Sequence, residues 1–184
     1  MSIDKLCYFS NSYDAKPGKG VNEYVLDINK YNELSKIKDW RRVLSNFYIE
    51  RFKWRDNWYN SVEHAYQGYK IGIADKDKGY YFTLDSGNEI GQGNGLIAQK
   101  NRKLVVLTLE QLIFFNGIKD YIMKDITRER IKQSDVYRNV LYNTKDAELW
   151  HIRSRKKPIR NLYMEELRNE IMAPVAPVAH LYLN

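Results

Sequence analysis

The chain has 184 residues, of which 43% are hydrophobic. This length is enough to bury one hydrophobic core but short for two domains, so a single domain is expected. It contains no run of about 18 apolar residues, and its start lacks the basic and apolar segments of a signal peptide, which argues against a membrane span and against export. The formal net charge of +7 favours an anionic partner, such as nucleic acid, a nucleotide or a phosphorylated metabolite, without choosing among them.

Cysteine and histidine are scarce in this sequence. The single cysteine, Cys7, cannot form an internal disulfide, which fits a reducing compartment such as the cytoplasm. With only three histidines no metal site is expected, and no motif asks for a cofactor. We therefore expect one soluble, cytoplasmic domain spanning 1–184, with the Pro/Ala-rich residues 173–184 as an extended tail.

The first half of the chain predicts short strands and helices. "KLCYFS" (5–10) has the composition of a strand, and apolar residues three apart predict a short helix within 28–40. Aromatic and β-branched residues around "RDN" predict a hairpin over 47–59, which we expect to be the main sheet element. Residues 60–73 follow as a helix with apolar side chains at core-facing spacing.

The second half is predicted to be mostly helical. Four glycines within 86–95 predict a loop whose backbone can approach a ligand closely. Residues 96–133 predict two or three helices with a break near Asn116-Gly117. Two further helices are expected, one from Ser134 to the turn "NTKD" and one amphipathic helix over 161–172.

A Pro/Gly loop near the start, "DAKPGKGVNEY" (14–24), loosely resembles a phosphate cradle around Lys19. It lacks the spacing and the Lys-Ser/Thr ending of a P-loop. The motif alone therefore favours a plain turn.

Glu63 allows two interpretations. If Asn60 is the N-cap of its helix, Glu63 falls at N3 and completes a capping-box-like pair worth about 0.5 to 2 kcal/mol. Alternatively Glu63, Gln67 and Lys70, spaced i, i+4 and i+7, line one helix face that can bind a sugar or a phosphate. The same three side chains can also form a solvated stripe, so periodicity leaves the question open.

Several motifs together resemble the NADAR family, also called the YbiA-like family. They are "LSNFY" (44–48) followed by a hairpin, "SVEHAYQGYK" (61–70) and "VLYNTKDAELWH" (140–151). The resemblance also takes in "YFSNSYDAKPGKGVNE", "DWRRVLSNFY" and "LDSGNEIGQGNGLIAQKNRKLVVL", so it covers nearly the whole chain in order. It implies a compact, mainly helical fold with a small β component.

Members of that family are N-glycosidases. They cleave the C–N bond of phosphoribosylated intermediates of riboflavin synthesis or remove ADP-ribose from modified guanine in nucleic acid. The resemblance thus implies hydrolysis of an N-glycosidic bond to a phosphate-bearing ribose, with an ADP-ribose conjugate, a phosphoribosyl small molecule, or ADP-ribosylated DNA or RNA as partner. This activity needs neither a metal nor a cofactor.

The resemblance assigns a role to each matching side chain. Glu63 would stabilise the oxocarbenium-like transition state and take a proton from water. Asn46 and Gln67 would hold ribose hydroxyls, and Lys70 and Lys19 would hold phosphate.

Further roles fall on the segment "KDAELWH". Asp146 and Glu148 are the preferred second acids, and His151 can donate the proton instead. Phe47 and Trp150 would stack on the base, although a large aromatic at the end of a helix is as often a core residue.

Arg102 and Lys103 are expected to contact phosphate or nucleic acid, and His64, turned about 100° from Glu63, is expected to support the helix rather than react. The chain departs from the family at Asn94, where many members are acidic, and in "RIKQ" (130–133). The Trp-Gly segment of many members has no clear counterpart unless Trp150 with the following histidine stands in for it.

Two alternatives to removal of ADP-ribose from nucleic acid remain at this point. One is cleavage of a small phosphoribosyl metabolite by the same chemistry. The other is a non-catalytic module that binds ADP-ribose or nucleic acid, in which Glu63 only caps its helix and the basic segments supply affinity.

Overall fold

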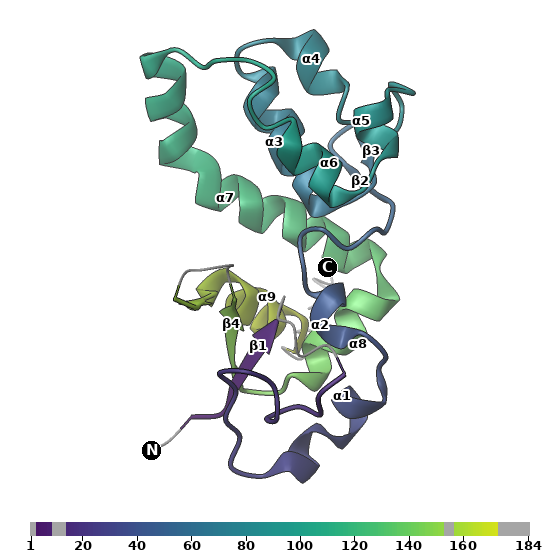
Figure 1. Ribbon diagram of the computed structural model, residues 1–184, viewed down its shortest axis with the longest axis vertical. Coiled ribbons are helices and arrows are strands. Elements are labelled where there is room, and N and C mark those ends of the chain that lie inside the picture. Colours follow the sequence, from purple (N-terminus) through teal and green to yellow (C-terminus); the bar gives the residue numbers. More distant parts are fainter. Residues whose placement is uncertain (1–2, 9–13, 153–156, 173–184) are drawn as a thin grey trace, which may run out of the picture.

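The computed structural model describes residues 3–8, 14–152 and 157–172, and the tail predicted at 173–184 lies outside them. The fold is mainly helical with two small sheets, which confirms the predicted class. Figure 1 shows an elongated molecule in which the long helix α7 (Leu109–Gln133) runs from one end of the upper part into the lower part. Each part has its own set of elements.

The lower part is built from both ends of the chain. Its elements are β1 (Lys5–Tyr8), η1 (Ile28–Tyr31), α1 (Asn32–Lys36), α2 (Trp40–Val43), α8 (Asp135–Asn143), β4 (Glu148–His151), β5 (Ile159–Arg160) and α9 (Leu162–Met172). The upper part is built from the middle of the chain. Its elements are β2 (Phe52–Trp54), β3 (Asn57–Tyr59), α3 (Val62–Gly72), α4 (Lys76–Tyr80), α5 (Glu89–Gln92) and α6 (Gly95–Lys100).

The larger sheet is not the one that the sequence predicts. The hairpin forms as β2 and β3, in register from Phe52 opposite Tyr59 to Trp54 opposite Asn57. The three-stranded sheet instead has the order β1-β4-β5, with β1 parallel to β4 and β4 antiparallel to β5. The prediction that the hairpin is the main sheet element is therefore wrong, because β4 was not recognised as a strand.

Two helix boundaries also differ from the prediction. The helix expected over 28–40 is a 3-10 turn followed by α1, which ends at Lys36, and α2 starts anew after Asp39, whose φ is +56°. The break expected at Asn116-Gly117 does not occur, because α7 continues through it. A Thr108–Gln111 capping box starts α7. One exposed glycine destabilises a helix by about 1 kcal/mol, which is not enough to interrupt a helix as long as α7.

The glycine-rich segment 86–95 is shorter as a loop than predicted. It contains α5 and ends where α6 begins. The Asn88 side-chain oxygen accepts from the Ile90 amide, and the Asn94 oxygen accepts from the first amides of α6. The two asparagines between the glycines thus serve as helix N-caps, which the glycine content does not indicate.

The core consists of hydrophobic clusters joined by α7. One cluster fills the lower part and includes Ile131, whereas a second packs the hairpin and α3 against Ile122 and Ile126. A third cluster lies under α5 and α6 around Phe82. Because α7 supplies buried side chains to two of the clusters, it fixes the upper and lower parts relative to each other, and the candidate site lies where they meet.

The Pro/Gly loop is organised around an internal anion. The buried Glu23 carboxylate accepts hydrogen bonds from the amides of Gly18 (2.9 Å) and Gly20 (3.0 Å) and from the Arg41 guanidinium (2.7 Å). It also accepts from the Cys7 amide at 3.0 Å, which ties the loop to β1. The loop amides that a phosphate would need are therefore occupied, and Lys19 is exposed to solvent.

Candidate active site

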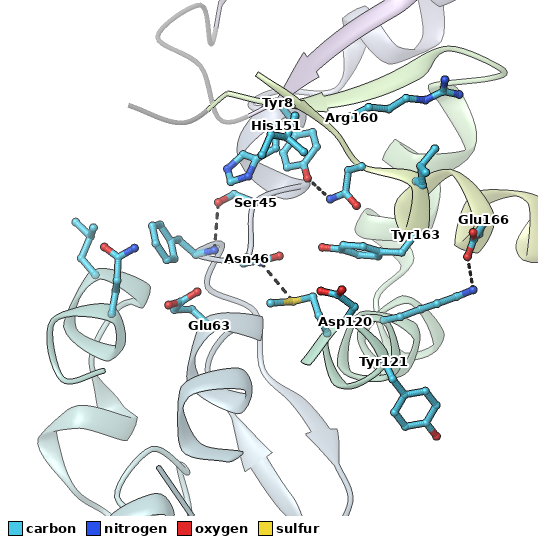
Figure 2. Close-up of a pocket in the computed structure, with 18 residues that line it drawn as sticks. Tyr8, Ser45, Asn46, Glu63, Asp120, Tyr121, His151, Arg160, Tyr163 and Glu166 are labelled. Atoms are coloured by element: carbon cyan, nitrogen blue, oxygen red, sulfur yellow. Dashed lines mark hydrogen bonds and ion pairs between the residues drawn. The ribbon is translucent and has the colours of Figure 1, made fainter. Parts of the chain in front are cut away.

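A cavity of about 1170 Å³ opens between the upper and lower parts (Figure 2). Its walls come from the segment after α2, the start of α3, α6, the middle of α7, the β1-β4-β5 sheet and the start of α9. Four residues that the sequence singled out line it: Asn46, Phe47, Glu63 and His151. The structure thus gathers side chains that lie more than a hundred positions apart.

Glu63 stands at the beginning of α3, but not in the capping position expected. Ser61, not Asn60, is the N-cap, and its hydroxyl accepts from the His64 amide. Glu63 is therefore the second helical residue, and the capping box is absent. Its backbone N–H donates to the Asn46 carbonyl at 2.9 Å, so the helix start is attached to the segment that brings Asn46 and Phe47 into the cavity wall.

The Glu63 carboxylate is buried, with 7% of the residue exposed, although it lines the cavity. Gln67, one turn later, donates its amide N–H to Glu63 Oε1 at 2.9 Å. Burial raises the pKa of the Glu63 carboxyl, while the hydrogen bond from Gln67 and the charges of Arg102 and Lys70 act in the opposite direction. A carboxyl whose pKa lies closer to neutrality is better suited to proton transfer than an ordinary one.

The other members of the predicted helix face lie behind Glu63. Gln67 is buried, and its side-chain oxygen has no hydrogen-bond partner among the described residues. The Lys70 ammonium lies 6.0 Å from the centroid of the Phe115 ring, and Arg102 is exposed on the turn after α6. None of the three is a cavity-lining residue, but both cations act electrostatically on Glu63.

Asn46 and Phe47 are presented by the turn between α2 and β2. The Asn46 amide donates to the thioether sulfur of Met123 at 3.5 Å, which is a weak acceptor. The Phe47 amide donates to the Ser45 hydroxyl at 3.1 Å, as drawn in Figure 2. Opposite Phe47, α6 begins with Gly95, where an added Cβ would lie 2.7 Å from the Phe47 Cα. The close approach of α6 to this turn therefore requires glycine.

Replacing Gly95 with alanine should displace the turn that carries Asn46 and Phe47. We expect a loss of about 1 to 3 kcal/mol in the free energy of unfolding, because the new methyl group meets backbone and not a flexible side-chain end. Urea unfolding measures the effect. Gly117→Ala in α7 is the matched control: apart from its chain neighbours and its own helical backbone, no atom lies within 4 Å of the added Cβ, so the variant should gain about 0.5 to 1 kcal/mol. Equal stability of the two variants would contradict the packing described.

His151 forms part of the sheet wall. Its ring stacks on Tyr8 of the neighbouring strand, with centroids 5.1 Å apart and planes inclined by 6°. The Tyr8 hydroxyl is hydrogen-bonded by the Asn161 amide at the start of α9. This arrangement presents a flat aromatic surface on the cavity side of β1 and β4 (Figure 2).

Asp146, Glu148 and Trp150 are not brought into the cavity. Asp146 is exposed and pairs with Lys30. Side chains alternate along a strand, so Glu148 and Trp150 share the face of β4 opposite to that of His151. There the Trp150 indole donates to Glu148 at 2.9 Å, and Glu148 pairs with Arg160 at 2.6 Å. The Lys5 ammonium lies 4.1 Å from the Trp150 ring centroid on this face.

Other side chains of the cavity were not singled out from the sequence. Asp120 and Lys124, one turn apart on α7, line it together with Tyr163 and Glu166 of α9. Lys124 pairs with Glu166 at 2.5 Å, whereas Asp120 makes no ion pair or hydrogen bond within the described residues. Asp120 and Lys124 are spaced i, i+4, which places them on one face of a helix. The helix break predicted at Asn116-Gly117 hid that this face belongs to a single long helix, α7.

His64 supports the site from behind, as its direction on the helix predicts. Its Nδ1 lies 2.7 Å from the Ser61 hydroxyl, and its Nε2 lies 3.0 Å from the Ile90 carbonyl of α5. A carbonyl only accepts, so Nε2 carries the proton and Nδ1 accepts from Ser61. Burial lowers the pKa of His64 to about 4, although the bond to Ile90 acts in the opposite direction.

Acidification should therefore destabilise the protein through His64. The unfolded chain takes up a proton below its ordinary pKa of about 6.5, whereas the folded chain does so only near 4, so stability falls as pH drops through this window. The loss is on the order of 3 kcal/mol. Urea unfolding at intervals from pH 7 to pH 4 measures it against His64→Gln, which should show a shallower pH dependence. Parallel curves would contradict a neutral buried imidazole.

Comparisons of the sequence with protein-family models, with curated proteins and with solved structures give no match. In the part of the chain that the structure describes, no three His, Cys, Asp or Glu side chains come together as potential metal ligands. No helix there has the length and hydropathy needed to cross a membrane. The function must therefore be inferred from the motifs and from the geometry of the cavity.

Proposed function

We propose that this protein is an N-glycosidase of the NADAR type that hydrolyses the bond between a base and a phosphate-bearing ribose. The observation that carries the proposal is the buried Glu63 carboxylate in the wall of a large cavity, held by Gln67 and with a raised pKa. A capping role alone does not account for this position, because Ser61 caps the helix. The motif resemblance supplies the reaction, and the geometry supports it.

In the proposed reaction water replaces the base at C1 of the ribose. The C–N bond breaks with its electron pair passing to the base nitrogen, and the positive charge that develops on the ribose is stabilised by the ionised Glu63 carboxylate. The water oxygen forms the new C–O bond, and one of its protons passes to Glu63. The departing base is protonated by the acid so formed or by solvent. A raised pKa makes Glu63 a stronger base for this transfer.

Asn46 and Asp120 are the polar groups proposed to hold the ribose or the base. The Asn46 amide donates to a thioether at 3.5 Å, a weak acceptor that a substrate oxygen would replace, and the Asn46 side chain also hydrogen-bonds with Tyr163. Asp120 is the second carboxylate of the cavity without an ion pair among the described residues and offers acceptors to hydroxyl or N–H groups. Because Asp146 and Glu148 lie outside the cavity, we do not assign them to the reaction.

The size and walls of the cavity favour a large substrate. Pockets for small ligands span about 300 to 1,000 Å³, and this one reaches about 1170 Å³. Phe47 and the Tyr8–His151 stack provide aromatic surfaces for a base. An ADP-ribose conjugate matches these dimensions better than a small phosphoribosyl metabolite, so we propose ADP-ribosylated guanine, free or in nucleic acid, as the substrate.

Incubation with three compounds tests the substrate class. ADP-ribosylated guanosine, ADP-ribosylated single-stranded DNA and a ribosylaminouracil phosphate are each mixed with the protein, and mass spectrometry follows the products. These are ADP-ribose with guanosine or unmodified DNA from the first two compounds, and ribose phosphate with the free aminouracil from the third. The proposal expects release from one or both ADP-ribosylated compounds. Release from the aminouracil compound alone would assign the protein to a small-metabolite glycosidase, and binding without release would identify a binding module.

A further inference from the structure

A second cavity of about 330 Å³ lies at the other end of α3. It is an open pocket lined by the β2-β3 hairpin, the C-terminal half of α3, and α4, and it shares no lining residue with the cavity around Glu63. Its floor is formed where α3 and α4 cross at two glycines: a Cβ added to Gly79 would lie 2.6 Å from the Gly72 Cα. A rise of 1.5 Å per residue places this floor roughly 14 Å along the helix from Glu63.

The charge of this cavity has one sign. Its charged lining residues are Arg55 and Lys76, and no carboxylate lines it. Two acidic residues flank Lys76 in the sequence: Asp75 is paired with Lys78 at 3.0 Å, and Asp77 does not line the cavity. Two cations that face a shared concave space without a counter-ion repel each other, and an anion bound between them would relieve that repulsion.

Arg55 is held in place before any ligand arrives. It occupies the hairpin turn with φ of +53°, and its guanidinium lies 4.5 Å from the Trp54 ring centroid and 4.9 Å from that of Tyr69. Stacking on two rings restricts the guanidinium but uses none of its N–H donors. Within the described residues neither Arg55 nor Lys76 makes a hydrogen bond or an ion pair through its side chain. The forked donor of Arg55 is therefore free for a planar or tetrahedral anion.

We propose that this second cavity binds a phosphate group of a nucleotide or of single-stranded nucleic acid. Arg55 contacts two phosphate oxygens with its fork, and Lys76 supplies a compact second charge. Tyr80, which lines the cavity and is 45% exposed, offers a ring on which the attached base can stack. The proposal does not depend on the hydrolysis proposed for the Glu63 cavity, because it concerns binding of an unmodified phosphate.

Binding of two unmodified probes tests the site. The full chain is titrated into a fluorescein-labelled single-stranded oligothymidylate and followed by fluorescence anisotropy, and adenosine monophosphate is titrated into the chain by calorimetry. The variants are Arg55→Gln and Lys76→Gln. Lys53→Gln is the matched control, since Lys53 is exposed on the same hairpin but does not line the cavity. Thermal melts of every variant verify folding.

The proposal expects Arg55→Gln and Lys76→Gln each to weaken binding about ten-fold, the loss of one charge-assisted contact. Each should also lower the slope of log Kd against log salt for the oligonucleotide by about one, whereas Lys53→Gln changes affinity less than about two-fold. Loss with both probes would identify a site that accepts free nucleotides, and loss with the oligonucleotide alone a site for polymeric nucleic acid. If the wild-type chain binds neither probe, or if both variants titrate like Lys53→Gln, the proposal is overturned.

Discussion

Glu63→Gln should lower the rate of base release by about 10² to 10⁴-fold while leaving the affinity for ADP-ribose nearly unchanged. The amide keeps the size of the side chain and can still accept from Gln67, but it neither carries the negative charge nor takes a proton. Because burial raises the pKa of Glu63, removing its charge should also relieve a desolvation cost, so the variant should be at least as stable as the wild type at neutral pH. Single-turnover kinetics and calorimetric binding of ADP-ribose measure the two effects.

Glu166→Gln is the control for that substitution, since Glu166 lines the same cavity but is paired with Lys124. Its effect on the rate should be less than about ten-fold, because an exposed ion pair contributes up to about 1 kcal/mol.

Activity of the wild type should also fall as pH drops through the raised pKa of Glu63, because only the ionised carboxylate acts as the base. If Glu63→Gln releases base as fast as the wild type, Glu63 is not the catalytic carboxylate.

Arg130→Met should cost about 3 to 5 kcal/mol of stability, the effect of breaking a buried charged network. The guanidinium is fully buried between Tyr48 and Tyr137, with ring centroids 5.2 and 4.3 Å away. It donates to the carbonyls of Val43 and Ser45 at 3.2 Å each, at the start of the turn that presents Asn46 and Phe47. Methionine fills most of the space but donates no hydrogen bond, so the Val43 carbonyl loses this donor and the Ser45 carbonyl keeps only the one from the Tyr48 amide.

Arg128→Met provides the comparison on the same helix. Arg128 forms a two-pronged pair with Glu170, with both distances 3.0 Å, but both residues are partly exposed, so its loss should cost about 0.2 to 1 kcal/mol. Urea unfolding of both variants measures the difference, and calorimetry should show weakened ligand binding for the Arg130 variant, because the turn loses its anchor. Similar stabilities for the two variants would mean that Arg130 does not hold the turn in place.

Local sequence patterns predicted the elements whose own residues show amphipathic spacing or characteristic turn residues. The amphipathic spacing of 161–172 and the turn chemistry of the hairpin correspond to α9 and to β2-β3. The strand β4 had no such signal: it has four residues and pairs in parallel with β1, whose residue Lys5 lies opposite Glu148. Pairing between segments this far apart depends on the packing of α8 and α9 around them, which periodicity does not report.

The candidate site was predictable in part, because the sequence pointed to residues of its upper side and to His151 in the sheet wall. Glu63, Asn46 and Phe47 lie in contiguous motifs on the upper side of the cavity, and the structure brings them together. Asp120 and Tyr163 come from two helices, α7 and α9, and the i, i+4 spacing of Asp120 and Lys124 alone does not place them near Glu63, which they meet through the path of α7 between the two parts. Interactions of that kind follow from tertiary packing and not from spacing in the sequence.

The most direct test of the proposed function is a time course of guanine-containing product released from ADP-ribosylated guanosine by the wild-type chain, measured by mass spectrometry beside Glu63→Gln at equal concentration. The account predicts equimolar appearance of ADP-ribose and guanosine with the wild type, and release at least about 10²-fold slower with the variant. Binding of the same compound by the wild type without any release would contradict it and would leave the Glu63 cavity as a recognition site.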